Sequence, residues 1–331
     1  MSPQFSIIIP VYNRPDEVDE LLNSLSQQTV KQFEILIVED GSEIDCKEIV
    51  NKYSDQLDIS YYYIYNCGPG QARNYGARYA QGDYLIVLDS DCILPSGYIS
   101  SVHKEIIETQ ADAFGGPDRA LSTFTPIQKA INYSMTSLFT TGGIRGGKKN
   151  IKKFYPRSFN MGIRKSVYNA LGGFSAIRFG EDIDFSIRIY AAGYKVALFP
   201  SAYVYHKRRN NFKTFFKQVY NSGIARINLY KKYPDTLKLT HFFPSCFLLF
   251  YLVSLFVSPF CALGLAFVLL YSIVLFLHST VLNGSLKVGL LSVIASFVQL
   301  TGYGAGFIVA FWKRIILRKD EFSAFEKNFY K

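Results

Sequence analysis

Strand-like and helix-like segments alternate through the first third of the chain, and this alternation is the strongest constraint on its fold. Each strand segment is a short apolar run, and the intervening helices repeat apolar residues at i, i+3, i+4 and i+7. Elements in this order form a mostly parallel sheet with helices on its faces, an α/β fold. The predicted strands are 5–12, 33–38, 59–65 and 84–88, and the predicted helices include 69–80 and the segment opened by Asn13 and Pro15.

Polar residues mark the carboxyl ends of three of these strands, in Tyr12-Asn13, Asp40-Gly41-Ser42 and Asp89-Ser90-Asp91. Ligands of parallel sheets bind beyond the carboxyl ends of the strands, so we expect all three groups at one crevice. Two carboxylates at the end of a buried strand are costly, and a divalent cation with phosphate oxygens behind it would compensate for them. An ordinary strand-ending turn is the alternative for the last group.

Charge is distributed unevenly, although the formal total is +10. Residues 1–118 hold 7 Lys or Arg against 19 Asp or Glu, whereas no acidic residue lies between Arg119 and Gly180. This basic stretch favours a phosphate group or an anionic lipid surface. We expect no nucleic-acid partner, because the chain carries no nucleic-acid recognition motif. The basic residues there include Arg145, Lys148, Lys149, Lys152, Lys153, Arg157, Arg164 and Lys165.

The cysteines and the N-terminal residues indicate a reducing compartment. The five cysteines are scattered and form no Cys-x-x-Cys pair, so neither a disulfide framework nor a zinc site is predicted. Residues 1–6 lead straight into a strand pattern and show no signal peptide. We therefore expect the first part of the chain on the cytoplasmic side. The cysteines are Cys46, Cys67, Cys92, Cys246 and Cys261.

The last third of the chain has the composition of a membrane region. Residues 242–282 are nearly free of charge, and 286–312 contain only Lys287 near their start. A spanning helix needs about 20 apolar residues, so the region 242–312 has room for two or three crossings. Basic clusters on both sides favour an even number, whereas apolar length alone allows three segments, and the parity stays open. The predicted segments are 242–259, 260–282 and 286–312, with breaks at Pro259 and at 283–285, a juxtamembrane linker at 231–241 and a basic tail at 313–331.

The segment from Phe212 to Arg226 has the pattern of a basic amphipathic helix. Its aromatic and aliphatic residues share one face, while Lys213 and Lys217 lie off that face. This pattern suits a membrane surface. Core packing against the preceding domain is the alternative, because apolar stripes of this kind are commonly core.

Five motifs in order resemble the family 2 inverting glycosyltransferases of GT-A fold, over residues 4–230. The resemblance implies a GT-A domain at 1–230, with a nucleotide-binding half at about 1–118 and an acceptor half at about 119–230. The motifs are SIIIPVYN at 6–13, VEDGS at 38–42, GQARN at 70–74, LDSD at 88–91 and GEDIDF at 180–185 with Arg188.

For the donor nucleotide, the resemblance implies that Asp40 hydrogen-bonds the nucleobase and that Pro10 and Tyr12 line the same slot. A carboxylate facing an N–H edge forms a charge-assisted contact, which is consistent with this role. A turn residue before Gly41 is the compatible alternative for Asp40. Arg73 would reach the nucleotide or its phosphates, although an arginine on a solvated helix face is the common case.

For the metal, the resemblance implies that Asp89 lies near the ribose and that Asp91 binds Mg²⁺ or Mn²⁺. Hard oxygen ligands suit these ions, and phosphate and water would complete their coordination. His206 stands where some GT-A enzymes place a further metal or phosphate ligand. A surface or interfacial histidine beside Lys207 and Arg208 is the alternative.

For the chemistry, the resemblance implies that Asp182 is the base that takes the proton of the acceptor hydroxyl. An acid in the first turn of a helix, favoured by the helix dipole, is the alternative for Asp182. Asn160 and Glu181 would face the acceptor or the sugar. Residues 218–222 lack the Arg and Trp of the processive Gln-x-x-Arg-Trp motif, so one sugar per encounter is expected.

These observations predict a multi-pass enzyme of the inner membrane, with its catalytic domain facing the cytoplasm. It would move a sugar from a nucleotide donor, expected to be a UDP-sugar, to a lipid-linked saccharide acceptor in surface polysaccharide synthesis. Direct transfer to a polyprenyl phosphate is a close variant. A membrane-tethered nucleotide-sugar-binding regulator without turnover is the alternative from another class. A dehydrogenase is less favoured, because no Gly-x-Gly-x-x-Gly follows the first strand.

Overall fold

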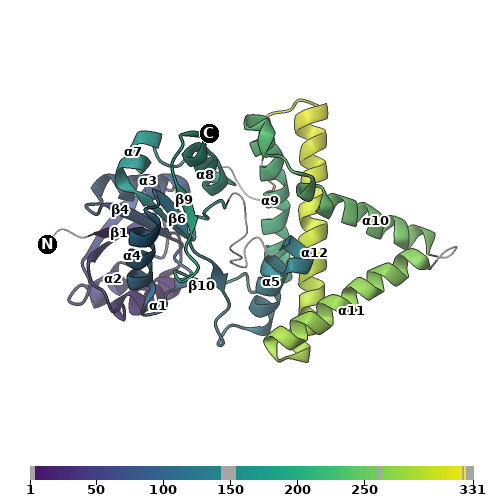
Figure 1. Cartoon of the computed structure of the whole chain (residues 1–331), viewed down its shortest axis with the longest axis horizontal. Coiled ribbons are helices and arrows are strands. Elements are labelled where there is room, and N and C mark those ends of the chain that lie inside the picture. The colour runs from purple at the N-terminus through teal and green to yellow at the C-terminus, as the bar shows by residue number, and fades with distance from the viewer. Residues whose placement is uncertain (1–3, 143–153, 259–261, 323, 326–331) are drawn as a thin grey trace. The chain divides into compact units, whose positions relative to one another are not determined.

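The computed structural model describes residues 4–142, 154–258, 262–322 and 324–325. The chain forms two compact units, each built from two or more segments (Figure 1). Among the described residues, the first unit comprises 4–121 and 154–207, and the second comprises 122–142 and those from 208 to 325. The predicted boundary lies at residue 230, whereas 122–142 and 208–230 group here with the apolar helices.

The first unit contains the predicted α/β sheet. Its strands and helices alternate along the chain, as the apolar patterns predict. The elements are β1 Phe5–Val11, α1 Pro15–Ser26, β2 Phe33–Asp40, α2 Lys47–Tyr53, β3 Ile59–Ile64, α3 Pro69–Tyr79, β4 Tyr84–Leu88, β5 Cys92–Ile93, α4 Tyr98–Thr109, β6 Ala113–Gly115, β7 Asp118–Arg119, β8 Asn160–Arg164, α7 Lys165–Leu171, α8 Glu181–Ala191, β9 Val196–Leu198 and β10 Val204–His206.

The main sheet has seven strands in the order β3-β2-β1-β4-β8-β6-β9. Strands β1 to β4 are parallel to one another where they pair, and β6 and β9 are also parallel. Strand β8 runs antiparallel to both β4 and β6. The prediction of a mostly parallel sheet with flanking helices is therefore confirmed. Its switch in direction at β8 sets Asn160 opposite Leu88, directly before Asp89.

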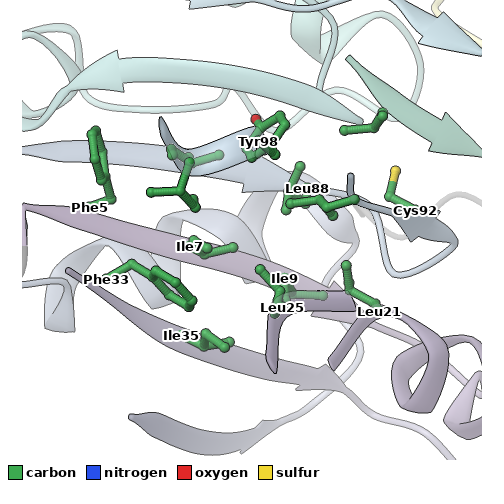
Figure 2. Packing of buried hydrophobic residues seen from close by; sticks show 14 of the residues in the cluster. Phe5, Ile7, Ile9, Leu21, Leu25, Phe33, Ile35, Leu88, Cys92 and Tyr98 are labelled. Atoms are coloured by element: carbon green, nitrogen blue, oxygen red, sulfur yellow. The ribbon is translucent and has the colours of Figure 1, made fainter. Parts of the chain in front are cut away.

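Alternating side chains of the central strands fill a core on each face of the sheet. Phe5, Ile7 and Ile9 of β1 belong to one cluster together with Leu21 and Leu25 of α1 (Figure 2). Ile8 belongs to the cluster on the opposite face, with Leu36, Leu85 and Phe185. Because both faces are covered, the strands read as continuous apolar runs, and their polar side chains are left at the strand ends.

A second sheet of three short strands lies in the same unit, in the order β5-β10-β7. His206 in β10 pairs with Cys92 in β5, and the same strand runs parallel to β7, which begins at Asp118. This small sheet holds His206 next to the Asp89-Ser90-Asp91 segment, more than a hundred residues earlier in the chain.

The second unit is helical within its described residues. It contains α5 Pro126–Thr136, α6 Leu138–Thr141, α9 Phe212–Lys232, α10 Phe243–Val257, α11 Leu263–Asn283 and α12 Leu286–Ala310, with short turns η1 Pro234–Thr236, η2 Leu239–His241 and the π-helical extension η3 Phe311–Ile316. The three apolar helices lie where the three apolar segments were predicted. Two helices, 263–283 and 286–316, are long and apolar enough to cross a membrane by length and composition.

The apolar face of α9 is covered by helices of its own unit. Phe215 and Val219 pack in one cluster with Ala295 of α12 and Ile131 of α5. The helix predicted at 212–226 is present and extends to Lys232, but this part of its apolar face is not free to contact lipid. The packing alternative applies, with α12 as the main partner in place of the preceding domain.

Glycines let α9 and α12 approach closely, as the side-by-side helices in Figure 1 show. A Cβ added at Gly306 would lie 2.0 Å from the backbone oxygen of Tyr220, and one at Gly223 would lie 2.3 Å from that of Tyr303. Gly302 and Gly306 are four residues apart, a spacing typical of tight helix pairs in membranes. The sequence carries this signal, but the apolar pattern alone did not identify it.

Gly306→Ala is expected to destabilise the second unit by about 1–3 kcal/mol, because the added methyl group must push α9 away from α12. The measurement is denaturant unfolding in detergent, followed by the fluorescence of Trp312, the only tryptophan in the chain. Gly97→Ala is the control, because its nearest non-neighbouring atom is the Ser100 hydroxyl at 3.7 Å. Equal unfolding midpoints for the two variants would contradict this account of the contact.

Candidate functional site

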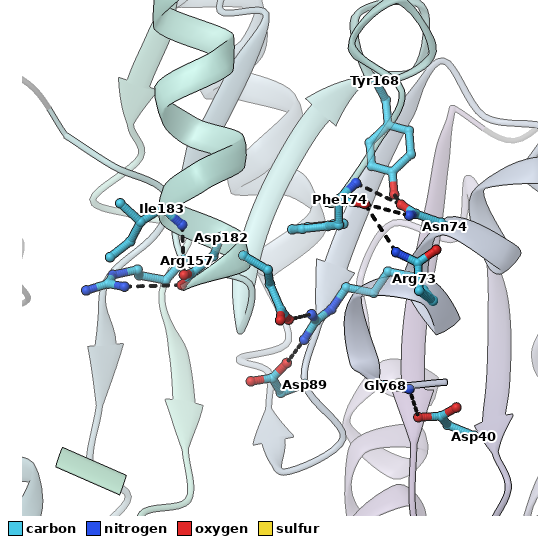
Figure 3. A network of polar contacts seen from close by, with 12 residues as sticks. Asp40, Gly68, Arg73, Asn74, Asp89, Arg157, Tyr168, Phe174, Asp182 and Ile183 are labelled. Carbon is cyan, nitrogen blue, oxygen red and sulfur yellow. Dashed lines mark hydrogen bonds and ion pairs between the residues drawn. The ribbon is translucent and has the colours of Figure 1, made fainter. Parts of the chain in front are cut away.

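The ends of β1 and β2 are joined by side-chain contacts to backbone amides. Asn13 adopts a positive φ of 54°, and its side-chain oxygen accepts hydrogen bonds from the amides of Glu43 and Ile44 at 2.8 and 3.0 Å. Asp40 accepts hydrogen bonds from the amides of Cys67 at 2.7 Å and Gly68 at 2.9 Å (Figure 3). Asp40 therefore holds the segment that leads into α3.

Asp40 is 4% exposed, and burial raises the pKa of its carboxyl group, although the two amides oppose this shift. The contacts of Asp40 in the structure are therefore those of a turn residue, the compatible alternative to its predicted nucleobase role. Tyr12, the residue directly after β1, is 48% exposed, whereas Pro10 is buried within β1. Of the three residues predicted to line the nucleobase slot, Tyr12 offers the largest accessible surface.

Arg73 connects two distant carboxylates at the centre of the site. Its guanidinium group contacts Asp89 at 2.8 Å (Figure 3) and Glu181 at 2.5 Å. Arg73 is 3% exposed and also lies over the ring of Phe174. The common case of an arginine on a solvated helix face does not apply. The residue joins α3, the end of β4 and the start of α8 into one network.

Glu181 is buried in this network and is held by Arg73. Burial raises the pKa of Glu181 to about 7, with Arg73 opposing the shift and the charge of Asp182 adding to it. The prediction that Glu181 faces the acceptor or the sugar differs from this geometry, because its carboxylate is occupied by an internal arginine. Glu181 acts here as the link that fixes the start of α8 to the end of β4.

Asp182 follows Glu181 in the first turn of α8. Its carboxylate contacts Arg157 at 3.3 Å and accepts a hydrogen bond from the Ile183 amide at 2.8 Å. Gly180, which precedes the helix, has a φ of 84°, a conformation that side chains other than glycine rarely adopt. The helix starts at this turn, and its first two carboxylates contact different partners: Glu181 contacts Arg73, and Asp182 contacts Arg157.

Asp184 is the third acid of this turn, and it has an internal role. It accepts hydrogen bonds from the Ser175 hydroxyl at 2.7 Å and from Arg188 at 3.0 Å. Arg188 in turn donates to the backbone oxygens of Leu171 and Gly173. This set ties α8 to the loop after α7 and leaves Asp182 as the least committed acid of the turn.

Asp91 lies between a guanidinium group and an imidazole. Its carboxylate contacts Arg14 at 2.7 Å and His206 Nε2 at 3.1 Å. Burial alone would raise the pKa of Asp91, but the charges of His206 and Arg14 outweigh it and lower the pKa below its usual range. Asp91 is therefore ionised at neutral pH, the form that binds a metal.

The residues around Asp91 fit a divalent metal ion. Ligand atoms of Asp91, Cys92 and His206 lie within 4.8 Å of one another. The Cys92 thiol is a poor member of this set, because burial raises its pKa well above its usual value and keeps it protonated. A carboxylate oxygen and an imidazole nitrogen 3.1 Å apart remain, a separation that one ion could bridge. The surface alternative for His206 does not apply, since its ring stacks on Phe159.

Asn160 lies inside the protein rather than at its surface. It is 1% exposed, accepts a hydrogen bond from the Tyr98 hydroxyl at 2.6 Å and donates to the backbone oxygen of Ala202 at 2.8 Å. The prediction that Asn160 contacts a sugar has no support in this geometry. A polar side chain at a strand end can form hydrogen bonds inside the core or contact a ligand, and its sequence position alone does not distinguish these two roles.

Sequence reasoning missed two arginines of the site. Arg14 pairs with Asp91 and Arg157 pairs with Asp182, although Arg157 was noted only as part of a basic stretch. The signal for Arg14 is its place directly after Tyr12-Asn13 at a strand end. Of that stretch, Arg145, Lys148, Lys149, Lys152 and Lys153 lie outside the described residues.

Two family models match the chain. The model described as glycosyl transferase family 2 matches residues 6–172, and the model described as glycosyl transferase family group 2 matches residues 151–297. The first match contains strands β2 to β8, nearly all of β1 and the Asp89-Ser90-Asp91 segment, and the second contains α8 and most of the apolar helices.

Curated relatives with similar sequences are glycosyltransferases. The chain is 36% identical to glycosyltransferase GlyA of Streptococcus pneumoniae over 111 residues, 33% of this chain and 16% of GlyA. It is 25% identical to probable glycosyltransferase YdaM of Bacillus subtilis over 308 residues, 84% of this chain and 73% of YdaM. The chain spans only 14% of an uncharacterized Rickettsia felis glycosyltransferase, at 45% identity over 86 residues, 26% of this chain.

Solved structures share the fold. A mannosyltransferase from Pyrobaculum calidifontis, solved with GDP-Man and Mn²⁺, matches with a TM-score of 0.61 and 14% identity over 95% of this chain and 88% of that one. Staphylococcus aureus TarS 1–349, solved with UDP, matches with a TM-score of 0.51 and 23% identity over 69% and 66% of the two chains. The predicted GT-A fold is thereby confirmed.

Proposed function

The chain belongs to glycosyl transferase family 2, and from this premise we propose that it transfers a sugar, with inversion, from a nucleotide-diphosphate sugar to a lipid-linked saccharide at a membrane. Surface polysaccharide synthesis is the proposed setting. The observation that carries the proposal is the Arg73 network, because it joins the end of β4 to the start of α8 through contacts of 2.8 and 2.5 Å. Donor and acceptor chemistry would thus share one rigid framework.

The donor would bind across the ends of β1, β2 and β4. Tyr12 would supply accessible aromatic surface for the nucleobase. Asp40, which accepts hydrogen bonds from the amides of Cys67 and Gly68, would shape the same slot together with Pro10. Asp89, fixed by Arg73, would face the ribose. We propose UDP as the nucleotide, in keeping with the TarS structure that contains UDP.

Asp91 and His206 would hold the divalent metal of the donor. The metal, when bound, supplies positive charge to the departing nucleoside diphosphate. An imidazole nitrogen is a ligand that transition metals accept more readily than Mg²⁺ does, so this pair favours Mn²⁺. The Pyrobaculum neighbour, which contains Mn²⁺, is consistent with this choice. Arg14, which contacts Asp91 at 2.7 Å, would add positive charge beside the diphosphate.

Asp182 would take the proton of the acceptor hydroxyl while that oxygen attacks the anomeric carbon. Its neighbours support this choice over Glu181, whose carboxylate is committed to Arg73, and over Asp184, which is bonded to Ser175 and Arg188. Arg157 keeps Asp182 paired in the absence of acceptor. A weak contact of 3.3 Å can be exchanged for the incoming hydroxyl group at modest cost.

The second unit would anchor the enzyme in the inner membrane, with the first unit facing the cytoplasm. Helix α11 has 21 residues and rises ~31 Å, enough for a bilayer core of about 30 Å. Helix α10 has 15 residues, rises only ~22 Å and would not cross. Two crossings, by α11 and α12, leave the basic clusters at 231–232 and 313–319 on the same side.

The proposal is tested by measuring nucleotide release from a panel of nucleotide sugars with Mn²⁺, with and without a membrane extract. We expect one UDP-sugar to be consumed and the rate to rise when the extract supplies the lipid-linked acceptor. A water-soluble saccharide acceptor that supports the full rate without extract would contradict the lipid-linked part. The absence of release from every donor under all conditions would contradict the transfer itself.

Asp91→Ala is expected to weaken Mn²⁺-dependent donor binding by about 10-fold to 100-fold, because a carboxylate ligand of the metal is removed. Donor affinity is measured by calorimetry at several Mn²⁺ concentrations and with chelator. The control is Asp55→Ala, which removes an exposed acid of the turn after α2. If Asp91→Ala bound donor as tightly as the unmodified protein at every Mn²⁺ concentration, Asp91 would not be a metal ligand.

A further inference from the structure

The segment before α10 packs on the C-terminal half of α9. Ile224 and Ile227 of α9 belong to one apolar cluster, and Leu237 and Phe242 pack against the same cluster. The apolar residues thus fix two stretches of backbone, 224–227 and 237–242, next to each other. Their intervening basic residues, Arg226 from α9 and Lys238 and His241 from around η2, gather at this junction.

Arg226 carries a charge that no carboxylate balances among the described residues. Its side chain is half-buried, and its Nε atom is buried without a hydrogen-bond partner. A buried donor without an acceptor is costly, so this atom indicates a missing acceptor group. The sequence offers little compensation, because Asp235 is the only acidic residue between Asp184 and Asp320 and it is exposed.

His241 has its proton on the nitrogen that is free to donate. Its Nδ1 accepts a hydrogen bond from the Lys238 amide at 3.0 Å, so the neutral ring carries its hydrogen on Nε2. Burial lowers the pKa of His241, the charges of Arg226 and Lys238 act in the same direction, and together they bring it to about 3. At neutral pH the site thus offers two cations and one neutral N–H donor.

We propose that Arg226, Lys238 and His241 form a binding site for a phosphate group presented by a lipid headgroup. A guanidinium group, an ammonium group and an imidazole N–H are the donors that phosphate oxygens accept. The apolar helix α10 begins at Phe243, two residues after His241, so acyl chains would have an apolar neighbour next to the headgroup. The inference rests on the proposed membrane association, but not on the choice of sugar donor or base.

The test uses the full chain in detergent micelles, because a chain with the two proposed membrane crossings would insert into any vesicle. Micelles with phosphatidylcholine alone are compared with mixed micelles that also contain a polyprenyl phosphate or phosphatidylglycerol; retained lipid is measured by native mass spectrometry, and inorganic phosphate is added as competitor. We expect Arg226→Gln to weaken retention of the anionic lipids by about tenfold, the effect of one charge-assisted contact. Lys213→Gln is the matched control, since it removes one exposed positive charge from the same helix.

The arms separate the sources of the phosphate. A loss confined to polyprenyl phosphate supports a phosphomonoester lipid, and a loss shared with phosphatidylglycerol supports a general anionic headgroup. Competition by inorganic phosphate with no dependence on the lipid in the micelle would overturn the lipid source, and equal losses for Arg226→Gln and Lys213→Gln would overturn the site. Lys238→Gln, at an exposed position, repeats the test if Arg226→Gln does not fold. Nucleotide release by the unmodified protein with membrane extract is measured in parallel, because failure of the transfer itself would abolish it while failure of this site would not.

Discussion

Asp182→Asn is expected to lower the rate of sugar transfer by about a thousandfold while donor binding is retained. The change removes the group that would accept the hydroxyl proton, and general bases contribute about 10²-fold to 10⁴-fold. The amide keeps the size of the side chain and its place at the start of α8. Transfer is measured as product formation under saturating donor and acceptor, and donor affinity is measured separately by calorimetry with Mn²⁺.

The matched control for this prediction is Asp55→Asn, which changes an exposed acid of the first unit in the same way. It should leave both transfer and donor binding unchanged. Normal turnover in Asp182→Asn would mean that the base is another residue. Glu181 would then be the next candidate, and Glu181→Gln would have to abolish transfer without releasing Arg73 from Asp89.

Arg73→Gln is expected to destabilise the first unit by about 3–5 kcal/mol, because it leaves a buried carboxylate without its cation. Glu181 is the partner most affected, since its side chain has 9% exposure and lies 2.5 Å from the guanidinium group. The measurement is hydrogen exchange of β1 and β4 peptides in the full chain. These strands form the centre of the sheet, so their amides exchange through the larger openings of the unit.

Arg78→Gln is the control for the Arg73 prediction, because Arg78 is an exposed arginine of the same helix. The double variant Arg73→Gln with Glu181→Gln should recover part of the lost stability, since it removes the unpaired charge as well. If the β1 and β4 amides exchanged at the same rate in Arg73→Gln and Arg78→Gln, the Arg73 network would contribute nothing to the stability of the unit.

The positions of the candidate residues in the fold were predicted best where these residues belong to local patterns. Asp89 and Asp91 follow a buried strand, and a helix starting near Asp182 follows from the glycines before it, so both could be placed from the sequence. The roles of Asn160 and Glu181 could not. Both are polar residues near strand or helix ends, and only their partners, Tyr98 for one and Arg73 for the other, show that they face inward.

The sequence by itself determined the order of strands and helices in the first unit and the three apolar helices of the second, because the periodicity of apolar residues is a property of a short window. The tertiary structure alone decided the pairings. Arg73 and Glu181 are 108 residues apart, and Arg14 and Asp91 are 77 apart, so no local pattern relates them. The environment of α9 also depends on a long-range contact: its apolar pattern suits lipid, but α12 covers that face in the structure. Long-range contacts depend on how whole elements pack, and packing selects among partners that the local sequence leaves equivalent.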